Sequence, residues 1–158
     1  MSENTIILAT DGSELSTRAL AIGRAVIDPG ADLVVATVVQ SEDPLNVTGT
    51  GFAGGVMTPD EFDEVNQSRM DEGARVAKEV ATALGLPDTS TVVLVGNPGH
   101  ALCDYAAEVS ARAIVIGSRG HGGVRRALLG SVSDHVVRNA PCPVVVTSDV
   151  DEPDPDAA

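Results

Sequence analysis

Short apolar runs rich in β-branched residues alternate along the chain with longer segments of helical periodicity, and this alternation restricts the fold more than any other feature. The runs typical of buried strands are Thr5–Thr10, Leu33–Val39, Thr91–Val95, Ala113–Gly117 and Val144–Thr147. Strands that are apolar throughout and joined by helices form parallel sheets covered on both faces. We therefore predict one α/β domain, a doubly wound, mainly parallel, five-stranded Rossmann-like sheet with helices on both faces.

Four segments between these runs repeat apolar residues every three or four positions, as helices do: 15–26, 62–84, 101–109 and 131–139. In the first of them the recurring residues are Leu15, Ala19, Ile22, Gly23 and Val26. The last ten residues, 149–158, alternate acids with proline and show no apolar period, which is typical of a disordered, solvated tail. The folded domain is expected to span residues 1–148.

The charge balance excludes two classes of partner. With 23 acidic and 10 basic residues, the chain carries a net charge of −13, whereas nucleic acids and anionic membranes require a basic surface. The N-terminus lacks the pattern of a secretory signal and no apolar stretch is long enough to span a membrane, so a cytoplasmic protein is expected. Cys103 and Cys142 lack metal-ligand spacing and are expected to be buried free thiols.

In doubly wound folds, ligands bind beyond the carboxyl ends of the strands. Three loops of this chain reach that edge, namely 11–13, 40–58 and 118–130. The second contains a GxGxxG match at 49–54, but no strand ends at its first glycine and no helix opens at its third, so we interpret it as a mobile loop. No GxxxxGK[ST] pattern occurs, which excludes a P-loop NTPase.

The loop after the fourth strand has the context of a phosphate-binding element. Gly117 and Gly120 permit a tight turn and close approach to a ligand, and Gly130 leads directly into a helix. Ser131 and Ser133 would add hydroxyl donors beside the unpaired N–H groups of that helix's first turn, which together favour an anion. The alternative is purely structural: residues 131–134 (SVSD) also match a capping box.

Basic residues are concentrated around the same loop. Residues 109–133 contain no acid and four arginines, Arg112, Arg119, Arg125 and Arg126, within an otherwise strongly acidic chain. A bound polyphosphate would account for this cationic segment, because its charge would offset that of the arginines. Solvated arginines are the alternative.

These residues carry a resemblance to a known family. Gly117, Gly120, Gly130 and Ser131 fill every fixed position of G-x2-G-x9-G-[ST], the signature of the ATP-binding branch of the universal stress protein family. An Asp-Gly-Ser turn at 11–13, the sequence GNPG at 96–99 and PCPVVV at 141–146 extend the resemblance. It covers roughly residues 3–148, and the family's usual acid before the fourth strand is replaced by Arg112.

The resemblance implies a regulatory protein of the stress response that binds ATP or AMP, with Mg²⁺ or Mn²⁺ held through the phosphates. It assigns the ribose to Asp11, the adenine edge to the backbone of Val39, and the nucleotide as a whole to Thr10, Asp11, Val39, Gly117, Ser118, Arg119, Gly120, Gly130, Ser131, Val132 and Ser133. From the residues alone, Asp11 is equally well explained as part of a helix cap with Glu14.

Two other functions remain open at this level. Slow ATP hydrolysis is one, although the sequence shows no base-and-metal constellation, and His121 and His135 are better explained as loop and helix-surface residues. The other is a structural dimer with an empty site. The loop after the first strand lacks the SGG-type sequence of the ATP pyrophosphatases, so adenylation chemistry is not expected.

A homodimer formed through residues 143–147 is expected. This final strand is short, β-branched and uncharged, and the polar tail that follows cannot cover it. Pairing with its own copy across a two-fold axis would be antiparallel and would satisfy the unpaired backbone groups of both strands. Members of the resembled family commonly dimerise in this way. An edge protected only by the acidic tail is the alternative.

The charge imbalance predicts a halophilic response. Only Lys78 among the basic residues is a lysine, and an acidic, lysine-poor surface suits a protein that works at high salt, although an ordinary acidic protein would also show it. Because salt screens the repulsion among the acids, the melting temperature should rise markedly from low to molar KCl. A melting temperature that stays flat or falls over this range, followed by circular dichroism, would remove the halophilic interpretation.

Overall fold

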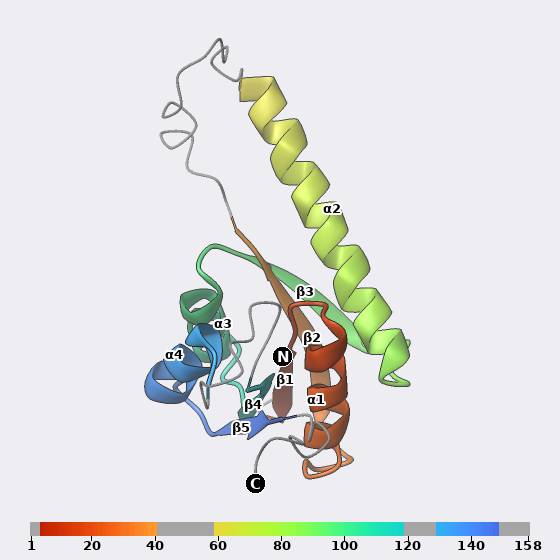
Figure 1. Ribbon diagram of the computed structural model, residues 1–158, viewed down its shortest axis with the longest axis vertical. Helices are drawn as coiled ribbons and strands as arrows, with labels where there is room; N and C mark the ends of the chain where they lie inside the picture. The colour runs from red at the N-terminus through yellow and green to blue at the C-terminus, as the bar shows by residue number, and fades with distance from the viewer. Residues whose placement is uncertain (1–3, 41–58, 119–128, 149–158) are drawn as a thin grey trace, which may run out of the picture.

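The computed structural model describes residues 4–40, 59–118 and 129–148 and confirms the expected order of elements (Figure 1). The elements are β1 (Thr5–Ala9), α1 (Glu14–Arg24), β2 (Asp32–Val39), α2 (Pro59–Ala83), β3 (Ser90–Val95), α3 (Pro98–Glu108), β4 (Ala113–Gly117), α4 (Ser131–Asn139) and β5 (Val144–Thr147). The glycine-rich match at 49–54 and the acidic tail lie outside the described residues, so the interpretations of both stay predictions.

The five strands form one sheet in the order β3-β2-β1-β4-β5, and every pair is parallel. This confirms the doubly wound α/β class. The order reverses at the centre, because β1 lies between β2 and β4. Ala9, the last residue of β1, pairs with Ala36 on one side and Ile116 on the other. The chain segments that follow β1 and β4 therefore diverge from the same point on the carboxyl edge of the sheet, which is where this fold class binds ligands.

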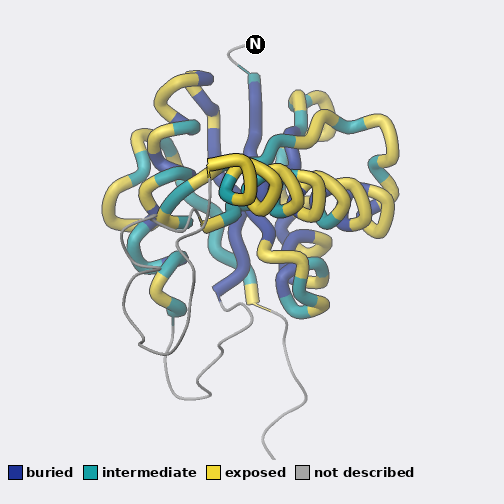
Figure 2. The backbone as a smooth tube through the Cα atoms, turned by 90° about the horizontal axis from the view of Figure 1, so that it is seen from above, coloured by how far each residue is buried: buried dark blue, intermediate teal, exposed yellow. Residues whose placement is uncertain are grey.

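Two helices cover each face of the sheet, and successive strand residues point to opposite faces (Figure 1). Ile7 of β1 packs with Leu102 of α3 and Val136 of α4. Its neighbour Leu8 packs with Leu20 of α1 and Ala77 of α2. Figure 2 shows the result: the strands form a buried centre, and the exposed residues lie on the outer sides of the helices.

Small residues set how closely α1 approaches the sheet. A Cβ atom on Gly23 would lie 2.4 Å from Cγ1 of Val115, so only glycine fits at this position. The residues that α1 buries are Ser16, Ala19, Leu20 and Gly23. Ile22 and Val26, which the periodicity grouped with the buried side, are 42% and 71% exposed. The buried side of α1 instead includes Ser16, whose hydroxyl is hydrogen-bonded to Thr10 inside the protein. Apolar periodicity does not count a buried polar residue, so it assigned Ile22 and Val26 to the buried side.

The long helix α2 shows a similar difference. Its buried residues are Gly73, Ala77, Val80 and Ala81, all in its second half, while Val65 is 36% exposed. Figure 1 shows the first half of α2 extending beyond the sheet. The expected apolar side is therefore buried only over the C-terminal part of the helix.

Both cysteines are free thiols, as expected. Cys103 is buried and Cys142 is half-buried, and burial raises the pKa of both thiols. A raised pKa leaves less thiolate at neutral pH, so neither side chain is activated as a nucleophile. Within the described ranges, no helix is both long and apolar enough to cross a bilayer.

Candidate functional site

Backbone geometry shapes the turn that follows β1. Gly12 has a φ of +79°, in the left-handed region, and a Cβ atom there would lie 2.5 Å from Cγ1 of Val76 in α2. Its N–H donates to Oγ1 of Thr10 at 3.0 Å, and Thr10 shares a buried hydrogen bond of 2.8 Å with the hydroxyl of Ser16. Thr10, expected among the ligand-binding residues, is thus buried and uses its hydroxyl to hold the turn.

Asp11 is exposed at the carboxyl edge of the sheet, two residues after the end of β1. Its Oδ1 accepts hydrogen bonds from the N–H of Ser13 at 3.0 Å and from the hydroxyl of Ser13 at 2.6 Å. Ser13 is the N-cap of α1, because its own side chain accepts from the N–H of Ser16 at 3.1 Å. The cap residue is therefore Ser13, and Asp11 takes part in the cap only through its hydrogen bonds to Ser13. These bonds orient its carboxylate, and the residue is exposed.

The loop after β4 is closed at its base by a short set of hydrogen bonds. The N–H of Gly130 donates to the C=O of Ser118 at 2.7 Å, and the hydroxyl of Ser133 lies 3.0 Å from both the Ser118 and the Gly130 carbonyl oxygens. We call these three residues the loop base. Ser133 is only 3% exposed. Its hydroxyl donates within the loop base, and the donor role toward a ligand that the sequence suggested stays a prediction.

Within the described part of the chain, the first turn of α4 has no side-chain cap. Its N-cap is Gly130, which has no side chain to bond the first amides, and Ser131 is exposed beside them. Asp134, the residue that a capping box would use, instead accepts from Nε of Arg138 at 3.0 and 2.9 Å. That ion pair holds the pKa of Asp134 below its usual value. The capping-box interpretation is therefore wrong.

The backbone N–H and C=O of Val38 form a polar edge on the side of β1; the sequence analysis placed the adenine contact at Val39, which stays a prediction. In a parallel sheet the N–H and C=O of one residue point to the same neighbouring strand, and successive residues alternate between neighbours. The C=O of Ala36 accepts from Thr10 at 2.9 Å, on the side of β1, and that of Val39 accepts from Gly96 at 3.0 Å, beside β3. Val38 therefore directs its polar groups to the side of β1.

These groups of Val38 lie beyond the end of β1, because β2 runs three residues past Ala36, which pairs with Ala9 at the end of β1. The edge thus faces the crevice between β1 and β4. The sequence could not show which residue of β2 points its backbone groups toward β1, since this is known only once the register between β1 and β2 is fixed. In the structure, the residue is identified by the offset between the carboxyl ends of the two strands.

Arg112 does not belong to the cationic segment near the site. It precedes β4 at the amino edge of the sheet, where its Nη1 lies 2.7 Å from Oδ1 of Asn4 and 3.1 Å from Oδ2 of Asp28. The pKa of Asp28 is lowered by the N–H of Gly30 and by this arginine. Its expected contribution to the ligand site is wrong, because the residue lies at the opposite end of the strand.

Two of the expected site residues, Arg119 and Gly120, lie outside the described part of the chain, as do His121, Arg125 and Arg126. His135 is described, and its ring packs against that of His100, with 4.2 Å between the centroids and the two planes tilted by 41°. It is half-buried against α3, so it is an interhelical contact as well as a surface residue. Among the described residues, no group of three or more His, Cys, Asp or Glu side chains could hold a metal ion.

Comparison with known proteins agrees with this architecture. The model of the universal stress protein family matches residues 3–148. A universal stress protein of Thermus aquaticus, from the QAH/OAS sulfhydrylase 3′ region, is 35% identical over 144 residues, which cover 90% of this chain and 96% of that protein. The protein YxiE of Bacillus subtilis is 33% identical over 148 residues, covering 90% and 97%.

Two solved structures share the fold. The protein MJ0577 superposes with a TM-score of 0.73 at 19% identity, covering 96% of this chain and all of that one. A universal stress protein solved in complex with cAMP superposes with a TM-score of 0.57 at 28% identity, covering 91% and 95%. Together, the match of the family model over nearly the whole chain and the similarity of the two curated relatives show that this chain belongs to the universal stress protein family.

Proposed function

We propose that this protein binds an adenine nucleotide in the crevice between the carboxyl ends of β1 and β4, and acts as a nucleotide-dependent regulator in the stress response. One observation carries the proposal. The loop base holds the N-terminus of α4, which is capped by Gly130, at the carboxyl end of β4. Because β4 pairs with β1, this helix end lies near the exposed Asp11 that follows β1. The two groups complement a nucleotide, because helix amides favour phosphate and a carboxylate accepts hydrogen bonds from ribose hydroxyls.

Each part of the nucleotide has a complementary group. The amides of Ser131, Val132 and Ser133 and the glycine-rich loop 117–120 suit the phosphates, and the exposed hydroxyl of Ser131 adds a donor. The adenine edge presents an acceptor beside an amine, and the N–H and C=O of Val38 supply the matching donor and acceptor. The relative solved with cAMP supports an adenine ligand at 28% identity.

ATP or AMP is the ligand that the glycine motif favours, with Mg²⁺ or Mn²⁺ held through the phosphates, because the described residues contain no acidic cluster for it. The function as a binding protein is preferred to slow ATP hydrolysis. Neither His135 nor Asp134 of α4 is positioned as a general base, because His135 packs against His100 and Asp134 pairs with Arg138, and Asp11 is assigned to the ribose.

The direct test is to purify the protein without added nucleotide, denature it, and identify what is released by chromatography. Release of ATP or AMP in near-stoichiometric amounts is expected. Replacement of Gly130 by Val should then weaken ATP binding by well over about tenfold in calorimetry, because the added side chain blocks close approach of the phosphates.

The fold should survive this change, since the φ of −73° at Gly130 is open to any residue. Gly30→Val, in an exposed turn, is the matched control and should bind normally. Equal affinities for ATP in the two variants would refute the site.

Substitution of the two serines of α4 should have different effects, one on nucleotide affinity and the other on stability. Ser131→Ala removes an exposed hydroxyl and should lower nucleotide affinity with little change in melting temperature. Ser133→Ala removes the hydrogen bond to the loop base and should lower the free energy of unfolding by about 1 kcal/mol. Thermal melts and titration calorimetry of both variants check this; stability loss confined to Ser131→Ala would contradict the assignment.

We also propose the dimer through β5. This strand is an edge of the sheet, as expected, and its four residues are only partly buried. Ile22 of α1 and Val26, in the turn just after α1, are exposed, whereas Arg24 points to α2 and bonds the C=O of Leu84. They therefore flank the β5 edge and extend the apolar surface that a second copy would cover.

The hydrogen bonds between β4 and β5 identify the residue of β5 whose substitution tests the dimer. The carbonyl groups of Pro143 and Thr147 point to β4, so those of Val144 and Val146 point outward. Val146→Pro removes only an outward N–H and should shift the mass in light scattering from about twice the chain mass to the chain mass. Val145→Pro breaks the bond to β4 instead and should lower stability. A native protein that is monomeric at high salt would refute the dimer.

A further inference from the structure

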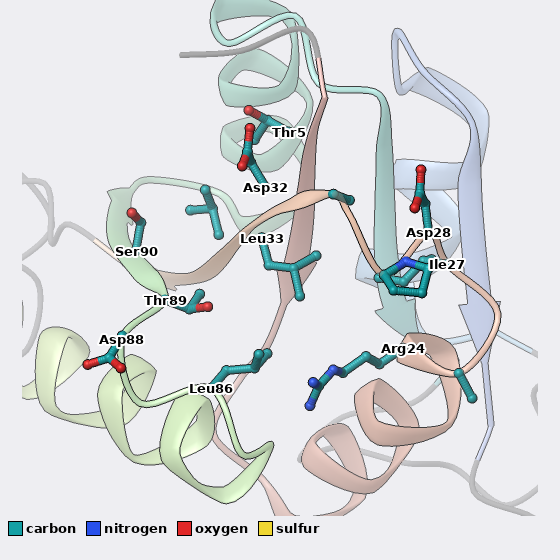
Figure 3. A pocket seen from close by; sticks show the side chains of 14 residues that line it. Thr5, Arg24, Ile27, Asp28, Asp32, Leu33, Leu86, Asp88, Thr89 and Ser90 are labelled. Atoms are coloured by element: carbon teal, nitrogen blue, oxygen red, sulfur yellow. The ribbon is translucent and has the colours of Figure 1, made fainter.

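A second cavity lies at the amino edge of the sheet, at the opposite end from the nucleotide site. Its volume is about 790 Å³, and it is bounded by the end of α1, the start of β2 and the connection from α2 to β3 (Figure 3). This volume is within the usual range for small-molecule sites. We call it the amino-edge cavity. It shares no residue with the proposed nucleotide site.

The floor of the amino-edge cavity is the uncovered end of a hydrophobic core. Ile27, Leu33 and Leu86 are packed against the cluster between the sheet and the helices α1 and α2, but remain partly exposed. They come from the three segments that bound the cavity, and all three line it. The floor can therefore remove apolar surface of a ligand from water.

The rim carries a cation, Arg24, that has no acidic partner among the residues that the structure describes. Nη1 of Arg24 donates to the C=O of Leu84, which fixes the guanidinium at the cavity. Arg24 has no carboxylate within ion-pair distance among the described residues, whereas Arg18, Arg112 and Arg138 are each paired with one. In a chain of net charge −13, an oriented and unpaired arginine on an apolar floor suits the anionic group of a ligand.

An anion, Asp88, lies on the same rim. Asp88 makes no hydrogen bond or ion pair with the described residues, and in Figure 3 Leu86 lies between its carboxylate and the guanidinium of Arg24. The other acids of the rim are Asp28 and Asp32; Asp28 is already paired with Arg112. The cavity thus presents a positive group, an apolar surface and a negative group.

We propose that the amino-edge cavity binds a short apolar peptide with free ends. The terminal carboxylate contacts Arg24, the side chains cover Leu33 and Leu86, and the terminal ammonium contacts Asp88. A single amino acid would leave most of the volume empty and carries its two charges on adjacent groups. A purely anionic ligand would be repelled by the aspartates, and a purely cationic one by Arg24.

The test is titration calorimetry with the tripeptide Ala-Leu-Ala on the full-length protein without nucleotide. Saturable binding at millimolar concentration or below is expected, weakened by about tenfold when the peptide is N-acetylated or C-amidated, because each block removes one charge-assisted contact. Unchanged binding of the blocked peptides, or no binding up to several millimolar, would overturn the proposal.

Variants tie the binding to the cavity. Arg24→Gln should abolish the preference for the free carboxylate and Asp88→Asn that for the free ammonium. Arg18→Gln, also on α1, and Asp104→Asn, on α3, are matched controls and should bind like the native protein. If Arg24→Gln and Asp88→Asn keep both preferences while their melts show folded protein, the peptide binds elsewhere and the proposal fails. The titration contains no nucleotide, so its failure would leave the nucleotide proposal unaffected.

Discussion

The parallel ladder between β1 and β4 is the interaction on which the rest of the structure depends. It brings Ala9 and Ile116 side by side, and with them the two segments that leave the sheet at its carboxyl edge. The turn with Asp11 and the loop base at Ser118 become neighbours only because these two strands pair, although more than 100 residues separate them in the chain. The phosphate and ribose contacts that we propose rely on this pairing, and the adenine contact adds the pairing of β1 with β2.

Buried hydroxyl groups stabilise the two segments after they part. Thr10 and Ser16 share a hydrogen bond beneath the first turn, and Ser133 donates to the loop base beneath the second. In each case a polar side chain is buried and satisfied, which defines one geometry in a way that apolar contacts alone do not. The groups left at the surface are Asp11 and Ser131, and these are the ones that face a ligand in our proposal.

The sequence predicted the fold well, because strands that are apolar throughout are typical of a parallel sheet covered on both faces. The helix α4 and the strands β4 and β5 have the predicted bounds. It predicted the roles of single residues less well. Ser133 and Arg112 each fitted a functional pattern, but their partners come from distant parts of the chain, Ser118 and Asp28. For Val39 the difficulty is different: its C=O accepts from Gly96, neighbouring strand residues point in opposite directions, and the sequence alone does not give the register.

The overhang of β2 past β1 has an evolutionary consequence. If the base is recognised by main-chain groups of Val38, then many apolar side chains can replace that valine without altering what is recognised. A one-residue insertion or deletion in the first half of β2 would be far more disruptive, because it would turn the opposite face of the backbone to the crevice. Selection at this position should therefore act on the length of the strand more strongly than on the identity of its residues.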